Sequence, residues 1–358
     1  MPSEQRNSLA NDLLSLLPGS PDAYPQKVDL IGMTVLLIQL DASAYRSASF
    51  LDDRILGPAT KGAWLPVSRT AEATRLVTSP RPVHFIFHTG HVGSTLVSRL
   101  LDETCEVLPL REPLPLRTLA EAHDVLGQTD SLLSDGQFDL VLGMFMRLWG
   151  RGYDATRAVV VKATSSTGRL AAAILGRDER SRAIYMNLRA EPYLATLLAG
   201  KNSPIDLRGH GPERMRRLQP RVAVPLSPVH TLSVGELAAM SWLAESWTQR
   251  DAVRQFAARV IAVDFEDFLS TVPESMGRIL DHFDLPHDVR HLSELSRSRV
   301  LTRYSKAPEY AYTPERRAEV LRDSRRQNRE EIRKGMEWLE HRARSDNAIA
   351  AIVNGAVT

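Results

Sequence analysis

Val83–Glu103, VHFIFHTGHVGSTLVSRLLDE, is the stretch of sequence that decides the fold of this chain. It begins with an apolar, β-prone run, Val83–Phe87, which is typical of a buried strand in a parallel sheet. The turn that follows contains Gly90 and Gly93, which let the backbone bend tightly and approach a ligand closely. From Leu96 onward the apolar residues recur at helical spacing. Strand, glycine-rich turn and helix start together predict an anion-binding cradle of backbone N–H groups at the positive end of a helix.

The turn does not match the common nucleoside triphosphate loop. A Walker A motif needs G-x-x-x-x-G-K-[ST], whereas Gly93 here lies three residues after Gly90 and is followed at once by Ser94 and Thr95, without a lysine. This spacing argues against a Mg-ATP or Mg-GTP site. A G-x-S-x-G nucleophile elbow is also excluded, because Ser94 directly follows Gly93. An ordinary strand–turn–helix without a ligand is the alternative interpretation.

The composition is that of a soluble globular protein, with 43% hydrophobic and 25% charged residues among 358. A net charge of +2 gives no bulk electrostatic reason to expect a nucleic-acid partner. Cys105 is the one cysteine, so neither a disulfide framework nor a cysteine metal cluster is expected. The acidic N-terminal stretch does not resemble a signal peptide, and the apolar run near Met33–Leu40 is too short to span a bilayer. We therefore expect a cytoplasmic protein with no membrane span.

Strand patterns alternate with helical patterns along most of the chain, which predicts an α/β fold with a doubly wound parallel sheet flanked by helices. We expect residues 1–80 to form an N-terminal extension packed on the core and residues 81–358 to form the α/β domain. Within the extension, Val35–Leu40 fits a strand or a buried helix equally well. Residues 201–231 predict a long connection, either a lid or a flexible insert. A long helix, Pro314–Arg344, is expected near the C-terminus.

Ligands of such sheets bind outside the carboxyl ends of the strands. Three polar segments follow predicted strands, namely Thr89–Thr95, Lys162–Ser166 and Arg189–Pro192. We expect these strand ends to converge on one crevice, with Glu112 beside them.

The loop resembles the 5′-phosphosulfate loop of sulfotransferases, in which a basic residue, a small residue and Gly precede Ser/Thr-Thr, as in KSGTTW or RSGSTL. His91-Val92-Gly93-Ser94-Thr95-Leu96 fits this frame, although His91 stands where the family usually has Lys or Arg. The resemblance covers about residues 83–290 and implies a P-loop-like fold. It also implies that Thr89, Gly90, His91, Val92, Gly93, Ser94 and Thr95 bind the donor nucleotide.

Later segments extend the resemblance in the family's order. Leu188–Pro192 is similar to the Arg-x-Pro step whose arginine binds the nucleotide 3′-phosphate, with one extra residue, and this implies that role for Arg189. Thr196 and Ser203 are the candidates for the serine that accompanies this arginine. Arg111-Glu112-Pro113 is similar to the Lys-Glu-Pro whose glutamate is the base in heparan-sulfate-type enzymes. Lys162-Ala163-Thr164 loosely resembles a Lys-Ser/Thr-Pro step, Val260–Phe283 resembles the family's strand with an acidic step and proline-led helix, and Arg333-Lys334-Gly335 resembles a nucleotide-binding RKG.

The resemblance implies transfer of a sulfuryl group from 3′-phosphoadenosine-5′-phosphosulfate to a hydroxyl or amine, without a metal. Glu112 would be the base, and Lys162 or His91 would supply positive charge to the bridging oxygen. Each residue also has a plainer interpretation. In these interpretations Glu112 is a surface carboxylate that pairs with Arg111, and Arg189 forms a salt bridge with Glu191 or another acid. Lys162 and His91 are then ordinary surface residues.

Two other functions stay open. One is a non-catalytic nucleotide-binding protein of sulfotransferase-like fold. The other is an atypical P-loop kinase, for which Asp264 is the one metal-binding acid placed like that of a Walker B motif. The acceptor is left open among small molecules, glycans and lipids, as is the oligomeric state.

Overall fold

This computed structural model describes residues 3–104 and 106–355, so Cys105 lies outside the described residues. A five-stranded parallel sheet flanked by helices confirms the predicted α/β class. The strand order is β5-β6-β4-β7-β8, so the chain leaves the central β4 first to one side and later to the other, as in a doubly wound sheet. The strands are β4 (Val83–His88), β5 (Val107–Arg111), β6 (Ala158–Lys162), β7 (Ala183–Asn187) and β8 (Val260–Asp264).

The chain divides into two compact units. The first unit comprises residues 1–87, 95–183 and 273–296, and the second comprises 88–94, 184–272 and 297–358. The predicted division at residue 80 stays a prediction.

The first unit holds the carboxyl ends of two neighbouring strands. Every residue of β5 and β6 is buried, because continuous apolar runs are covered on both faces of a parallel sheet. Their register pairs Arg111 with Lys162 at the ends of the two strands, which places Glu112 next to Lys162. The unit's helices are α1 (Ser3–Leu16), α2 (Ala42–Ser47), η1 (Asp53–Ile55), α3 (Val67–Thr74), α4 (Ser94–Thr104), α5 (Leu114–His123), α6 (Asp135–Trp149), η2 (Ser165–Leu170), α7 (Ala171–Leu175), α12 (Val272–His282), α13 (Val289–Glu294) and η5 (Leu295–Arg297).

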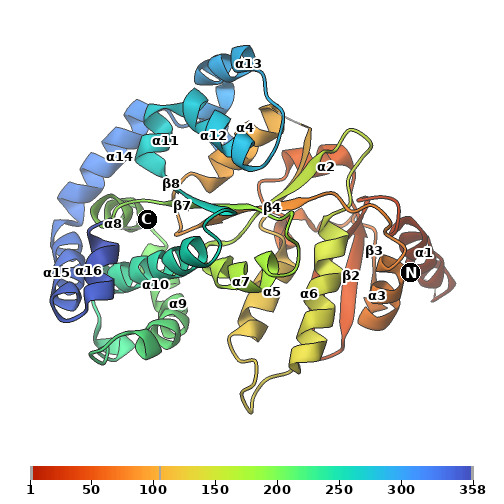
Figure 1. The fold of residues 1–358 in the computed structure, drawn as a ribbon, viewed down its shortest axis with the longest axis horizontal. Helices are drawn as coiled ribbons and strands as arrows, with labels where there is room; N and C mark the ends of the chain where they lie inside the picture. Colours follow the sequence, from red (N-terminus) through yellow and green to blue (C-terminus); the bar gives the residue numbers. More distant parts are fainter. Residues whose placement is uncertain (1–2, 105, 356–358) are drawn as a thin grey trace. The chain divides into compact units, whose positions relative to one another are not determined.

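The N-terminal extension forms an antiparallel sheet, β1 (Ala23–Asp29), β2 (Thr34–Gln39) and β3 (Gly62–Pro66), with α1 and α3 packed beside β3 (Figure 1). The ambiguous run Val35–Leu40 is therefore a strand. The buried guanidinium of Arg151 ties this extension down by donating to the backbone carbonyls of Leu17, Ser20 and Ala23.

In the second unit, α15 (Arg329–Ser345) and α16 (Asn347–Val353) lie against α10 (Val234–Gln255) (Figure 1). Ser233 caps α10 through a capping box with Glu236. The unit's remaining elements are α8 (Ala190–Leu198), α9 (Ser203–Leu218), η3 (Gln219–Arg221), η4 (Val229–Thr231), α11 (Phe265–Ser270), η6 (Arg299–Thr302), β9 (Arg303–Tyr304), β10 (Ala307–Ala311) and α14 (Pro314–Gln327).

The long connection predicted at residues 201–231 is wrong for the first half of that segment, because α9 fills it. Leu207, Gly211, Arg214 and Leu218 are buried at helical spacing despite Pro212. Side chains on α9 also bond to α10, since the Arg214 Nε donates to Ser241 and the Arg217 guanidinium pairs with buried Glu245 at 2.7 Å.

The predicted long C-terminal helix is broken at Asn328 into α14 and α15. The Asn328 amide donates to the Leu198 carbonyl, and the Ser324 hydroxyl donates to the Ala195 carbonyl, both on α8 or at its end. These two bonds fix the break by tying it to a neighbouring helix. Leu321 of α14 and Ile332 and Leu339 of α15 are buried.

His84, inside β4, makes the first unit sensitive to acid. Its ring stacks on Phe283 and accepts a hydrogen bond from the Arg182 N–H. Burial, helped by the nearby charges of Arg182 and His282 and opposed by Asp178, lowers the pKa of His84 to about 4. The unfolded chain therefore binds more protons between pH 4 and 6.5, so the neutral ring stabilises the fold above 6.5 and loses that effect as the pH falls toward 4.

As the pH rises from 4 to 6.5, we expect the free energy of unfolding to increase by about 3 kcal/mol because of His84. Urea denaturation at several pH values measures this slope. His84→Asn keeps an acceptor for the Arg182 N–H but does not titrate, so its slope should be shallower. Equal slopes in the two proteins would contradict the assignment.

Candidate functional site

The loop between β4 and α4 turns through left-handed backbone conformations. Gly90, His91 and Gly93 have φ values of 107°, 56° and 71°, and β-carbon strain makes such values uncommon for a residue such as His91. Successive backbone N–H groups in such turns form concave sites for anions, and α4 adds a helix N-terminus directly after the loop. The backbone therefore has the form that an anion cradle requires.

Glycine is required at position 93 for two reasons. The φ of 71° disfavours any side chain, and a Cβ built there would lie 2.0 Å from Cε2 of Phe265. Val92 beside it is buried, whereas His91 is exposed. The loop is thus fixed by apolar packing at Val92 and Gly93 and leaves the His91 ring at the surface.

Two threonine hydroxyls near the cradle lack partners. Thr89 Oγ1 and Thr95 Oγ1 are buried and have no hydrogen-bond partner among the residues described, while the Thr89 N–H donates to the Met186 carbonyl at 3.0 Å. A buried hydroxyl without a partner is costly, so these groups fit a ligand that supplies acceptor oxygens. A phosphosulfate supplies such oxygens, and the loop residues therefore fit the nucleotide that the motif implies.

Glu112 and Lys162 form an ion pair at the ends of β5 and β6. The Lys162 ammonium donates to Glu112 Oε1, with 1% of the Lys162 side chain and 11% of the Glu112 side chain exposed. The Glu112 N–H also donates to the Lys162 carbonyl at 2.6 Å. The interpretation of Lys162 as an ordinary surface lysine is therefore wrong.

The backbone of Glu112 is strained, with a φ of 56° that glutamate seldom adopts. Such outliers persist where the surrounding structure holds them and concentrate at functional sites. Here Pro113 follows directly, and the Leu51 N–H donates to the Arg111 carbonyl just before. Glu112 is thus held on a rigid corner with its carboxylate against Lys162.

Arg111 does not pair with Glu112, contrary to the plainer interpretation of Glu112. Its fully buried guanidinium donates to Asp102 at 3.1 Å and to three backbone carbonyls of the N-terminal extension. Burial lowers the pKa of Arg111 to about 10, although Asp102 opposes that shift. The side chain next to the predicted base is therefore structural.

Arg189 stands at the start of α8 with an exposed side chain. Its predicted alternative partner, Glu191, pairs with Arg325 instead, at 2.8 Å. Among the described residues the Arg189 guanidinium has no hydrogen bond or ion pair, although its charge acts on Asp264. Burial raises the pKa of Asp264 above its ordinary value, while bonds from the Asp267 and Glu266 N–H groups and the charge of Arg189 oppose the shift. An arginine without an ion-pair partner is a suitable group for a phosphate.

The two hydroxyls predicted to accompany Arg189 are already donors. Thr196 Oγ1 donates to the Pro192 carbonyl at 2.7 Å, and buried Ser203 donates to the Leu197 carbonyl. Neither residue is favoured by this geometry, and their role in nucleotide binding stays a prediction.

Arg333, Lys334 and Gly335 lie within α15, and each has a structural contact. Arg333 pairs with Glu330 and Glu337 of its own helix, and Lys334 pairs with Glu331. Gly335 is a close-packing position, since a Cβ there would lie 2.4 Å from Leu194 and 2.6 Å from the Gly235 carbonyl. The RKG-like triplet is thus accounted for by helix packing.

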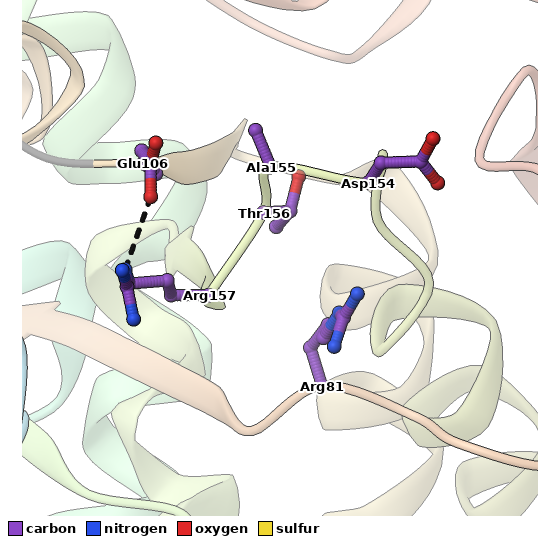
Figure 2. Close-up of a pocket in the computed structure, with 6 residues that line it drawn as sticks. All are labelled: Arg81, Glu106, Asp154, Ala155, Thr156 and Arg157. Carbon is purple, nitrogen blue, oxygen red and sulfur yellow. Dashed lines mark hydrogen bonds and ion pairs between the residues drawn. The ribbon is translucent and has the colours of Figure 1, made fainter.

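The first unit also contains a polar hollow of about 410 Å³, which is lined by other residues than Glu112 and Lys162 (Figure 2). Arg81, Glu106 and Arg157 line it, and each of them shortly precedes a strand, so the hollow marks the amino ends of β4, β5 and β6. Arg157 and Glu106 neutralise each other as an exposed pair at 3.0 Å (Figure 2). Ligands of α/β sheets bind at the opposite, carboxyl ends, so we do not assign the reaction to this hollow.

Within residues 3–104 and 106–355, no group of three or more His, Cys, Asp or Glu side chains could hold a metal ion. In the same part of the chain, no helix is long and apolar enough to cross a membrane.

Arg189→Ala should weaken the binding of 3′-phosphoadenosine 5′-phosphate by several-fold to hundreds-fold, about 1–3 kcal/mol, if Arg189 holds the 3′-phosphate. Adenosine 5′-phosphosulfate, which lacks that phosphate, should bind nearly as well as before. Calorimetric titration of both nucleotides measures the two affinities. An equal loss for both would show that the arginine is structural.

Comparison with known proteins gives remote likenesses. No protein-family model and no curated protein sequence matches the chain. Among solved structures, a mouse sulfotransferase complexed with PAP is similar, with a TM-score of 0.41 and 9% identity over 77% of this chain and 90% of that one. The sulfotransferase domain from the curacin biosynthetic pathway gives a TM-score of 0.37 and 15% identity over 64% of this chain and 83% of its own. A sulfotransferase from Mycobacterium avium gives a TM-score of 0.35 and 12% identity over 89% of this chain and 96% of its own.

At these identities and TM-scores the likenesses do not show that the chain belongs to the family.

Proposed function

We propose that this protein is a sulfotransferase that moves the sulfuryl group of 3′-phosphoadenosine-5′-phosphosulfate to a hydroxyl or amine of a small molecule, glycan or lipid. The observation that carries the proposal is the ion pair of buried Lys162 with the mostly buried Glu112 at the carboxyl ends of β5 and β6, with Glu112 on a strained corner. The glycine-rich loop, with no Walker lysine, supports a phosphosulfate in preference to a Mg-nucleotide.

The donor supplies a sulfuryl group that passes between two oxygens, so the protein's task is positioning and charge stabilisation. Backbone N–H groups of Gly90–Thr95 and the Thr89 and Thr95 hydroxyls bind the 5′ end, and Arg189 binds the 3′-phosphate. When the acceptor oxygen bonds to sulfur, Glu112 takes the acceptor proton. The bond from sulfur to the 5′-phosphate oxygen breaks, and 3′-phosphoadenosine 5′-phosphate leaves.

The ion pair links these two events. Lys162 is paired with the Glu112 carboxylate before the reaction. Once Glu112 has taken the proton it is neutral, and the Lys162 ammonium is then available to the oxygen on which the leaving group's charge develops. His91, at the loop position where the family usually has Lys or Arg, would add positive charge to that oxygen when its ring is protonated.

Acceptor-dependent release of 3′-phosphoadenosine 5′-phosphate from the donor tests the proposal. A panel of phenols, steroid alcohols, sugars and hydroxy-lipids should contain acceptors that raise this release, and EDTA should not reduce it. Donor consumption that requires a divalent metal would overturn the proposal. Tight nucleotide binding without consumption across the panel would favour a non-catalytic binding protein, the function to which the replacement of the family's basic residue by His91 points.

A further inference from the structure

One aromatic side chain of the second unit connects the glycine-rich loop to helix α14. Phe265 is the first residue of α11 and is buried. Three of its ring atoms lie 2.0, 2.5 and 2.6 Å from the place that a Cβ on Gly93 would occupy. The ring therefore lies directly against the Gly93 backbone.

The ring has a second neighbour that is itself held in place. The guanidinium carbon of Arg317, on α14, lies 5.1 Å from the centre of the Phe265 ring. Arg317 also donates to both carboxylate oxygens of Glu266, at 2.6 and 3.2 Å. A bidentate pair fixes the plane of the guanidinium, so Arg317 is positioned to keep the ring against the loop.

The conformation at Gly93 determines where the next N–H groups point. Gly93 is held at a φ of 71°, and Ser94 starts α4 directly after it. A change in the Gly93 dihedrals would therefore turn the first N–H groups of α4 away from an anion in the cradle. Small displacements of binding groups have large effects, because hydrogen bonds to an anion depend on distance and direction.

The geometry points to Phe265 as a positioning residue that supports the loop at Gly93, with Arg317 and Glu266 holding its ring, so that affinity for the 5′ anion of the donor depends on α14. This inference rests on the proposed function, since it takes the 5′ anion to be bound by the loop. Phe265 has no polar group, so its effect on the 5′ anion passes through the loop backbone.

The test compares two nucleotides that differ at the 5′ position. Phe265→Leu should raise the dissociation constant of 3′-phosphoadenosine 5′-phosphate about 10-fold and leave that of adenosine 3′-phosphate nearly unchanged. Arg317→Ala should act in the same direction but more weakly. Arg316→Ala is the matched control, because its exposed side chain pairs with Glu319 on the same helix, and both affinities should stay as in the wild type.

A second comparison tests the contact itself. Gly93→Ala should lower the melting temperature strongly, and adding Phe265→Ala should recover part of that loss, because the clash is removed while the strain of φ 71° stays. No recovery, or equal losses for the two nucleotides in Phe265→Leu, would overturn the inference. A wild-type protein that binds neither nucleotide would instead overturn the proposed function.

Discussion

Glu112→Gln should lower turnover about 10²–10⁴-fold, the usual contribution of a general base, with donor-nucleotide affinity nearly unchanged. The amide oxygen of glutamine can still accept from the Lys162 ammonium, so the corner at the end of β5 should keep its geometry. Glutamine cannot take the acceptor proton. It is neutral, as protonated Glu112 would be, so the Lys162 charge stays available to the leaving oxygen and the expected loss reports the missing base. Steady-state sulfation of an acceptor found in the panel measures the loss, and nucleotide titration of the same variant measures affinity.

The matched control is Glu106→Gln. Glu106 lies just before β5 and pairs with Arg157 in an exposed ion pair, so turnover should stay near that of the wild type. Turnover near the wild-type level in Glu112→Gln would remove Glu112 as the base and direct attention to His91. Lost nucleotide binding together with a lower melting temperature would make Glu112 part of the scaffold.

Arg111→Met should lower the free energy of unfolding by about 3–5 kcal/mol, the range for a buried ion pair that loses one partner. The variant keeps the side chain's length but removes the donors that hold the Tyr45, Arg46 and Ala48 carbonyls and the Asp102 carboxylate. Asp102 keeps its second partner, Arg46, at 2.5 Å, which limits the loss. Urea denaturation at neutral pH measures the difference.

Arg157→Met provides the control for Arg111→Met. It removes an arginine from an exposed pair at 3.0 Å, so stability should change by less than about 1 kcal/mol. A similarly small change in Arg111→Met would contradict the view that this buried guanidinium anchors the N-terminal extension.

The five strands of the main sheet could be predicted because each is a short and mostly apolar run of residues. The antiparallel strands of the N-terminal extension are harder to predict from the sequence. Val35–Leu40 was ambiguous, and β1 contains Pro25 and Lys27, with a register shift between them, so it lacks a clear alternation. The pairing of β1 with β2 depends on tertiary contacts, which a local sequence pattern does not contain.

Arginine, glycine and proline obscured the helical period of α9. Leu207, Gly211, Arg214 and Leu218 have that period, but Gly211 and Arg214 do not look like core residues. Arg214 is buried because Ser241 accepts a hydrogen bond from its Nε, and a partner 27 residues away is invisible to a local reading. The break at Asn328 depends in the same way on carbonyls at the end of α8.

For the site, strand order predicts that Glu112 and Lys162 lie close together, since each follows or ends a strand of one parallel sheet. Their direct pairing, and the pairing of Arg111 with Asp102, depend on which side chains point together, and sequence spacing does not fix that. Phe265 was missed as a functional residue for the same reason. The need for a glycine at position 93 is visible in the sequence, but the ring that requires it comes from residue 265.

Nucleotide-induced stabilisation of the full chain is the most direct test of the central claim. At about 100 times its dissociation constant, 3′-phosphoadenosine 5′-phosphate should raise the free energy of unfolding by about 2.7 kcal/mol, and EDTA should not change that gain. Mg-ATP should stabilise the protein much less, because the Gly90–Thr95 loop has no Walker lysine. Equal or greater stabilisation by Mg-ATP that disappears with EDTA would contradict the sulfotransferase assignment.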